Sequence, residues 1–207
     1  MPRSAAIAGV LFALLYGSAI VILRLSVPGA VTDRGAWLDS GAPLVATALH
    51  LFAYSGIAFL WFMGVLRTHI GAREDRFMST VYTGSGFLFI GLSYVAAAAI
   101  HALLGAAGDL GEQRFVESAA FQFGGRFAYE IANVYAVRMA GVFMVSLSTL
   151  CLRARAMPRG MVWATWVVAA ILLFGTAQTR WFALLFPLWV LAVSAYLLRQ
   201  PRADAPG

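Results

Sequence analysis

Long apolar stretches separated by short polar segments dominate the chain. Six of them are long enough to cross a bilayer core, which takes about 20 residues of helix. They cover residues 4–23, 43–66, 77–104, 127–152, 161–178 and 181–198. This pattern predicts an all-α fold, a polytopic transmembrane helical bundle of about six spans. Because the connecting segments are too short to fold alone, we expect residues 1–207 to form a single transmembrane domain.

The arginines between the apolar stretches predict how the bundle is oriented. With the N-terminus inside, the inner segments hold nine arginines, namely Arg3, Arg67, Arg73, Arg76, Arg153, Arg155, Arg159, Arg199 and Arg202. The outer segments hold five, namely Arg24, Arg34, Arg114, Arg126 and Arg180. Cytoplasmic loops carry an excess of basic residues, so the sequence predicts that both termini lie inside (N-in/C-in).

The first span has some features of a secretory signal peptide. Arg3 precedes an apolar run, and small residues follow it at 29 and 30. The run is longer than the 7–15 residues of a typical signal-peptide core, and Arg24 closes it as a helix end would. We therefore expect the first span to be retained.

Composition and charge exclude several classes of protein. With 61% hydrophobic and 12% charged residues, the chain has too little polar surface for a soluble globular protein. The sequence has no lysine, which excludes a Schiff-base or P-loop lysine, and the lone Cys151 excludes an internal disulfide and a cysteine-based metal site. The net charge of +6 is attributed to arginines in the cytoplasmic loops and to their contact with anionic membrane lipids. We therefore expect no nucleic-acid partner.

Four ionisable side chains lie within the predicted spans, where such groups are costly and are candidates for a functional site. They are His50, His101, Glu130 and Arg138. At about 1.5 Å per residue, His50 lies roughly 10 Å below the outer surface, His101 and Glu130 about 5 Å, and Arg138 about 17 Å, near the midplane.

Helical spacing groups these residues with other polar ones. Thr47, His50 and Tyr54 share one face of the second span, and Tyr94 and His101 are seven residues apart on the third. On the fourth span, Arg138 leans toward the outer end, where Asn133 and Glu130 lie. The pattern predicts an outward-opening polar cavity between these three spans. Its candidate ligand-binding residues are Arg138, Glu130, Asn133, His50, Tyr54, Tyr94 and His101.

Structural roles remain open for the same residues. His101 and Glu130 are close enough to the interface to reach water, and His50 could hydrogen-bond a neighbouring helix. Arg138 needs an anion or an acceptor cluster at its depth. Either Glu130 supplies that anion, or Arg138 is left for a bound carboxylate, phosphate or quinone oxygen.

Three functions compete on these grounds. The first is binding or transport of a small lipophilic molecule with an anionic or carbonyl head. The second is a single-haem b-type cytochrome with His50 and His101 as axial ligands of haem b, the one metal site considered. The third is a non-catalytic accessory subunit of a membrane complex. Since no catalytic motif is present, we identify no catalytic residue, and enzymatic activity stays an open alternative.

Two further segments suggest how the chain packs. Alanine recurs every fourth residue along the fourth span, a spacing that permits close helix approach and predicts a homo- or hetero-oligomer contact. These residues are Ala128, Ala132, Ala136 and Ala140. In the outer loop 105–126, Phe115, Ala119 and Phe123 would share one side of a short helix that could lie flat on the membrane as a lid.

Several runs of the sequence resemble a group of multi-pass integral membrane proteins of high-GC actinobacteria. The resemblance rests on residues 133–144 (NVYAVRMAGVFM), 58–62 (AFLWF), 74–77 (EDRF) and 186–190 (FPLWV). No activity is established for that group, so the resemblance implies no catalytic residue or substrate. It implies a bacterial plasma (inner) membrane location and is consistent with six helices.

Overall fold

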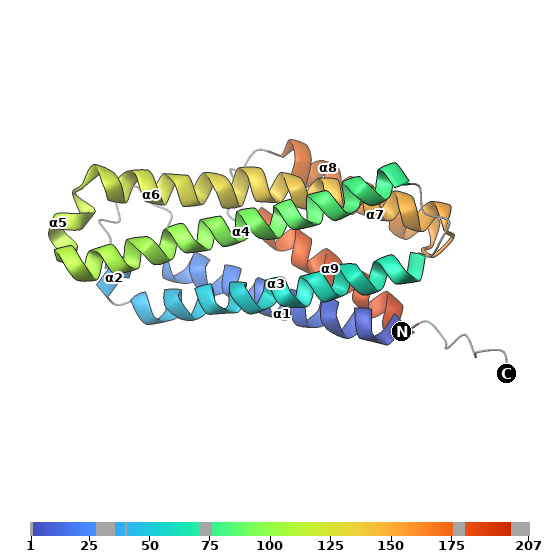
Figure 1. Ribbon diagram of the computed structural model, residues 1–207, viewed down its shortest axis with the longest axis horizontal. Helices are drawn as coiled ribbons and strands as arrows, with labels where there is room; N and C mark the ends of the chain where they lie inside the picture. The colour runs from blue at the N-terminus through green and yellow to red at the C-terminus, as the bar shows by residue number, and fades with distance from the viewer. Residues whose placement is uncertain (1, 28–35, 40, 71–75, 176–180, 200–207) are drawn as a thin grey trace.

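The computed structural model describes residues 2–27, 36–39, 41–70, 76–175 and 181–199, and every element within them is helical (Figure 1). The α-helices are α1 (Pro2–Ser26), α2 (Ala36–Asp39), α3 (Ala42–Ile70), α4 (Arg76–Leu110), α5 (Glu112–Val116), α6 (Ala119–Glu130), α7 (Val137–Arg153), α8 (Arg159–Phe174) and α9 (Leu185–Arg199). A π-helical segment, η1 (Ile131–Ala136), joins α6 to α7, and a 3₁₀ turn, η2 (Phe182–Leu184), precedes α9.

Among the described residues, five helices are long and apolar enough to cross a membrane, which is consistent with the predicted multi-pass helical protein. They are Ser4–Ser26, Ala42–Arg67, Arg76–Leu110, Ala119–Arg153 and Phe182–Arg199. The fifth predicted span, residues 161–178, corresponds to α8, whose 16 residues extend about 24 Å, less than the 30 Å of a typical hydrocarbon core. α8 ends because Gly175 adopts an extended conformation, and the last residues predicted for this span, 176–178, lie outside the described part.

Two helices continue well beyond their predicted ends. α4 and the unbroken run α6–η1–α7 each have 35 residues, about 52 Å of helix, whereas the hydrocarbon core needs about 30 Å. Their surplus, together with α2 and α5, forms one end of the molecule, which we call the extended end (Figure 1). A small hydrophobic cluster holds this end together and comprises Trp37, Leu38, Val45, Leu49, Leu103, Ala107 and Phe115.

The predicted outer loop is therefore helical, and the shared face that we expected there is not formed. Phe115 is buried in the cluster at the extended end, whereas Ala119 and Phe123 are exposed. The helix is interrupted between them, and a new one begins at Ser118, whose hydroxyl accepts a hydrogen bond from the Phe121 amide. This N-cap starts α6, which lies antiparallel to α4.

The helices pack in two groups that meet along the bundle. α1 packs against α3 and α9, while α4 packs against α6, η1 and α7, and α8 packs against α7. Phenylalanine joins the two groups at mid-height, because five helices each place one buried ring there: Phe12, Phe59, Phe89, Phe143 and Phe186. Ring centroids lie 4.8 Å apart for Phe12 and Phe59 and 4.6 Å apart for Phe89 and Phe186. We call this set the phenylalanine cluster.

The π-helical segment keeps the alanine repeat on one face. In an α-helix, residues spaced by four drift by about 40° per step, so Ala140 would lie about 120° from Ala128. A π turn contains one more residue than an α-helical turn, which reduces this angle of about 120° by about 100°. Accordingly Ala128, Ala136 and Ala140 are buried, on the helix that packs against α4. Three of the four alanines therefore pack within the chain, Ala132 is half-buried, and the oligomer contact that the spacing suggested stays a prediction.

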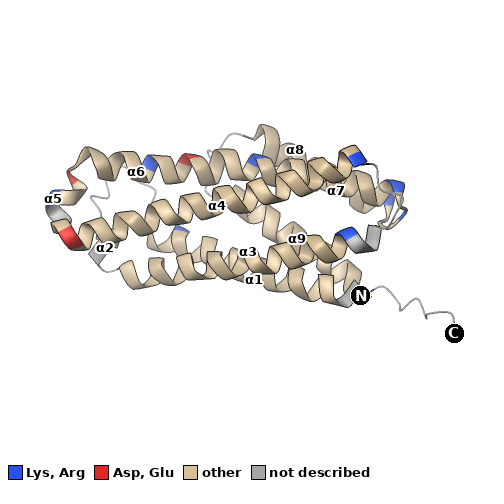
Figure 2. Ribbon diagram, viewed as in Figure 1, with Lys and Arg blue, Asp and Glu red and all other residues tan. Residues whose placement is uncertain are grey.

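Charge separates the two ends of the molecule. Figure 2 shows arginines concentrated at the end where α1 begins, and we call this the arginine-rich end. Its described members are Arg67, Arg76, Arg153, Arg155, Arg159 and Arg199. The acidic residues coloured in Figure 2, which are Asp109, Glu117 and Glu130, lie in the other half.

Candidate functional site

Arg24 and Asn133 connect the two groups of helices near the extended end. The Arg24 guanidinium, in the last turn of α1, donates a hydrogen bond to Asn133 Oδ1 in η1. The Asn133 amide nitrogen donates in turn to the Tyr129 carbonyl, at 2.8 Å. Both side chains are half-buried. These two hydrogen bonds orient the Asn133 amide so that its oxygen faces the Arg24 guanidinium, although the two residues are 109 positions apart in the sequence.

Arg138 belongs to the same stretch of helix. It is half-buried, and its Nη1 donates to the Val134 carbonyl at 2.9 Å. Glu130 is exposed and forms no ion pair with Arg138 in the described residues. An α-helix would place these two residues about 80° apart, and the extra residue in η1 reduces this to about 20°. They therefore share a face without touching, and a backbone carbonyl satisfies one donor of the guanidinium.

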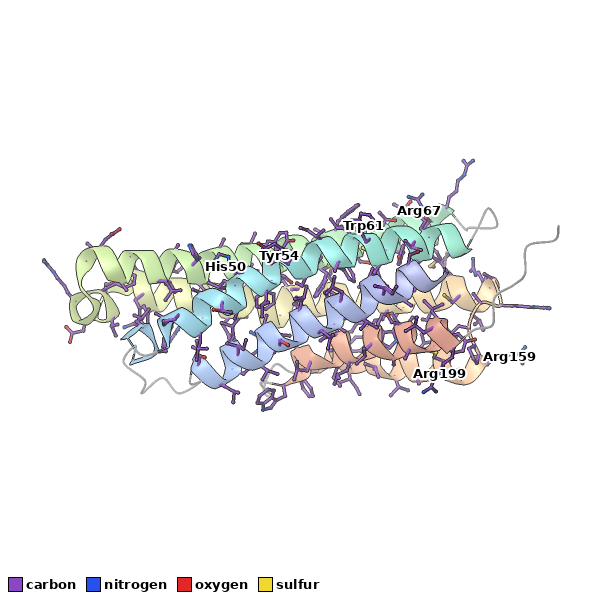
Figure 3. The ribbon with its side chains drawn as sticks, turned by 90° about the horizontal axis from the view of Figure 1, so that it is seen from below. His50, Tyr54, Trp61, Arg67, Arg159 and Arg199 are labelled. Atoms are coloured by element: carbon purple, nitrogen blue, oxygen red, sulfur yellow. The ribbon has the colours of Figure 1, made fainter. Side chains whose placement is uncertain are left out.

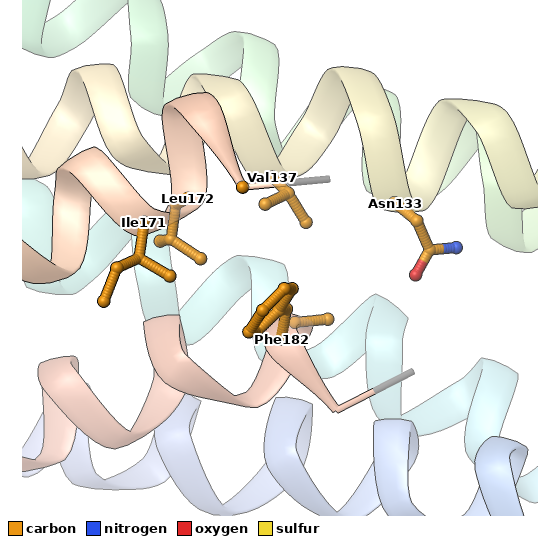
Figure 4. A pocket seen from close by; sticks show the side chains of 7 residues that line it. Asn133, Val137, Ile171, Leu172 and Phe182 are labelled. Atoms are coloured by element: carbon orange, nitrogen blue, oxygen red, sulfur yellow. The ribbon is translucent and has the colours of Figure 1, made fainter. Parts of the chain in front are cut away.

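A narrow opening lies beside Asn133, between the η1–α7 helix, the end of α8 and η2 (Figure 4). It is lined by Asn133, Val137, Ile171, Leu172, Gly175, Phe182 and Ala183. Its volume is about 10 Å³, close to the minimum that one water molecule needs. The floor is apolar and Asn133 supplies the polar side chain at the rim. The opening can hold a small polar group, and anything larger must lie along the outer surface.

Arg24 and Asn133 lie at one height along the bundle. Arg24 is 20 residues beyond Ser4 and Asn133 is 20 residues from Arg153, so each lies about 30 Å from the arginine-rich end. That distance matches the thickness of a hydrocarbon core. Arg138 lies about 22 Å from the same end, closer to the boundary than the midplane position that we expected and about 8 Å deeper than the other two. Arg24 and Asn133 therefore lie at the height of the core boundary on the extended side, and Arg138 lies within the core.

The other predicted site residues lie apart from this group. His50, Tyr54, Tyr94 and His101 are exposed on the outer surface of α3 and α4. Tyr94 reaches across to α3, where its hydroxyl donates to the Ala53 carbonyl at 2.9 Å. The structure thus brings Asn133, Arg138 and Glu130 together on one helix. The tyrosines and histidines form a second, outward-facing group.

The two histidines lie at similar heights on neighbouring helices. Gly86 of α4 lies against Met63 of α3, and the rings of Phe89 and Phe59 lie 5.5 Å apart. Continued along the two antiparallel helices, this register places His101 within about 5 Å of the height of His50. Both side chains are exposed on the outer surface, and their use as axial ligands of one haem stays a prediction.

Sequence reasoning missed Arg24 as a site residue. We interpreted it as the residue that closes the first span, a role that needs no partner. The residue type could have indicated the role, because an arginine at the hydrocarbon boundary needs a hydrogen-bond acceptor from a neighbouring helix. The chain matches no family model, no curated protein and no solved structure.

Proposed function

We propose that this integral membrane protein binds the anionic or carbonyl head of a lipid-soluble molecule at Arg24, Asn133 and Arg138. The observation that supports the proposal is the hydrogen bond from Arg24 to Asn133 beside an opening with an apolar floor. Guanidinium groups bind carboxylate and phosphate oxygens by charge-assisted hydrogen bonds. Here Arg24 lies at the depth that lipid headgroups occupy, and Arg138 lies about 8 Å deeper in the same half of the bundle.

The ligand's tail would lie along the surface of the bundle. Ile171 and Phe174 are exposed on α8, next to the opening, and Phe174 is 84% exposed. Trp181, also exposed, borders the start of η2. Aromatic side chains favour the membrane interface, and an apolar tail packs well against them. The opening beside Asn133 would accept the polar head of an amphiphile, and the exposed apolar side chains next to it would contact the tail.

Binding is better supported than transport. A transport path through the bundle would have to pass the phenylalanine cluster, in which Phe12, Phe59 and Phe143 have no exposed surface. Tightly packed cores are costly to open. The filled centre therefore favours a molecule that stays at the boundary.

The arginine-rich end belongs in the cytoplasm in this proposal, and the membrane is a bacterial plasma membrane. The concentration of arginines at one end supports the first point through the positive-inside rule. The binding group then faces the outer leaflet. The second point rests on the resemblance of residues 133–144, 58–62, 74–77 and 186–190 to actinobacterial membrane proteins.

Native mass spectrometry of the protein from lipid nanodiscs tests the proposal. The probe is phosphatidylglycerol in a phosphatidylcholine background. We expect retained phosphatidylglycerol, and we expect Arg138→Ala or Arg24→Ala to lower its affinity at least about 10-fold, because each removes a hydrogen bond to a charged group. Arg126→Ala, an exposed arginine on α6, is the matched control and should retain the lipid. Equal lipid retention by all four proteins would refute the proposed site.

The absorption spectrum of the same preparation tests the haem alternative. Because both histidines are exposed on the outer surface of the bundle and not buried between helices, we expect no Soret band even after incubation with haem. A Soret band that disappears in His50→Ala and in His101→Ala would overturn this expectation and restore the cytochrome interpretation.

A further inference from the structure

The exposed face of α3 carries polar side chains at positions where α1 and α8 are apolar. On α1, the exposed face presents Ile7, Leu11 and Leu14, and on α8 it presents Trp163 and Val167. These are side chains suited to lipid. The corresponding face of α3 runs Thr47, His50, Tyr54, Ile57, Trp61 and Gly64, all exposed. Figure 3 shows His50, Tyr54 and Trp61 in succession along the helix.

His50 and Tyr54 have no hydrogen-bond partner within the described residues. They lie 17 and 13 residues from Arg67, so about 25 and 20 Å from the arginine-rich end, inside a hydrocarbon core of about 30 Å. Lipid tails offer neither donors nor acceptors, and an unsatisfied polar group there is unfavourable. Two such groups, one helical turn apart, indicate that something other than lipid covers this face.

We propose that this face of α3 is the interface of a homodimer, in which Tyr54 of one copy donates a hydrogen bond to His50 of the partner subunit. All copies insert with the same orientation, so a two-fold axis along the membrane normal brings α3 against α3 in parallel. Equivalent residues then meet at the same height, as in an isologous interface. The phenol is a donor and a neutral imidazole is an acceptor, so the pair is self-complementary across that axis.

The spacing of the face suits helix packing. Its residues alternate by three and four positions, as the seam of a left-handed helix pair requires. From Thr47 to Gly64 the seam extends over 18 residues, about 27 Å, nearly the full hydrocarbon thickness. Side chains in a helix lean toward its N-terminus, so Tyr54 leans toward the level of His50. Gly64 has open space where a side chain would lie, which permits close approach at the far end.

Disulfide cross-linking in native membranes tests the interface. The single cysteine, Cys151, is buried and is replaced by alanine so that each variant carries one new cysteine. Ile57→Cys lies in the middle of the seam, and Val167→Cys on α8 is the matched control, since the two side chains are 55% and 60% exposed. We expect oxidation to give a predominant dimer for Ile57→Cys and only monomer for Val167→Cys. If the two variants cross-link equally, or neither does, the interface is wrong.

Tyr54→Phe tests the hydrogen bond itself, because it removes only the hydroxyl. In the Ile57→Cys protein we expect it to weaken dimerisation about 3- to 20-fold, measured as the protein-to-lipid ratio needed for half-maximal cross-linking. His50→Ala should act similarly, and the double variant should be little worse than either single one. Unchanged cross-linking in Tyr54→Phe would overturn the proposed pair. A monomer that instead captures another membrane protein or a lipid at this face would overturn the homodimer.

Discussion

The side chain of Arg24, on α1, donates a hydrogen bond to that of Asn133, in the α6–η1–α7 helix. The two residues come from the two groups of helices that otherwise meet through the phenylalanine cluster. A polar contact at the membrane boundary and an apolar one at mid-height thus hold the same two groups together. The Arg24–Asn133 hydrogen bond fixes the orientation of the two groups, and the phenylalanine cluster contributes most of the buried apolar area between them.

We predict that Arg24→Ala and Asn133→Ala each destabilise the protein by about 1–3 kcal/mol, because each leaves a polar partner unsatisfied. The double variant should lose less than the sum of the two, which a double-mutant cycle of thermal unfolding in detergent measures. Arg126→Ala, on the exposed surface of α6, should change stability by about 0.5 kcal/mol or less. Strict additivity of the two alanine variants would show that the contact is absent in the folded protein.

Phe89→Ala should cost about 3–5 kcal/mol of stability, because it leaves a cavity at the centre of the phenylalanine cluster. Phe87, two residues earlier on α4, is 56% exposed and serves as the control. Its replacement by alanine should change the unfolding midpoint little. Comparable losses for both variants in detergent unfolding experiments would mean that the rings do not form a core.

Gly56 lies where α4 approaches α3 most closely. A Cβ atom at this position would overlap the Tyr94 hydroxyl and displace it from the Ala53 carbonyl. We therefore expect Gly56→Ala to destabilise the protein by about 1–3 kcal/mol. Gly91, on α4, has nothing within 4 Å of its Cβ position, so Gly91→Ala should be neutral or stabilise by up to about 1 kcal/mol. Equal unfolding temperatures for the two variants would contradict the packing described for Tyr94.

Deletion of Tyr135 tests the π-helical segment. Removing one residue from a regular helix rotates everything beyond it by about 100°, which destroys packing. Within η1 the deletion should instead restore an α-helix and leave the faces of α6 and α7 in place. We expect the Tyr135 deletion to yield folded protein on size-exclusion chromatography. Deletion of Val145, in the regular part of α7, should yield aggregate. The opposite ranking would argue against the π turn.

The sequence predicted the helical class and most helix positions because spans depend on local apolar content. For the same reason it placed the end of α4 too early and the start of α6 too late. A hydropathy pattern measures only the hydrocarbon-crossing length, whereas α4 continues because Leu103 and Ala107 pack against residues of α2 and α3. That packing involves residues distant in sequence. The hydropathy pattern alone therefore could not have placed the end of α4 correctly.

The candidate site was predictable only in part. Spacing indicates that Thr47, His50 and Tyr54 share a face of α3, and all three are indeed exposed together. Spacing cannot say on which side of that helix its neighbours lie, and the face points outward. Similarly, Arg24 meets Asn133 across 109 positions, and the π turn that orients Asn133 has no sequence signal that we recognised.

The surplus length of α4 and α6 has a practical consequence. After about 30 Å of hydrocarbon and a headgroup layer of about 6 Å on each side, roughly 10 Å of each 52 Å helix stands in water. The helical turn at α5 therefore extends beyond the lipid surface as an ordered protrusion. We expect antibody fragments raised against the protein in intact vesicles to bind this protrusion, which would add the mass that imaging of so small a membrane protein needs.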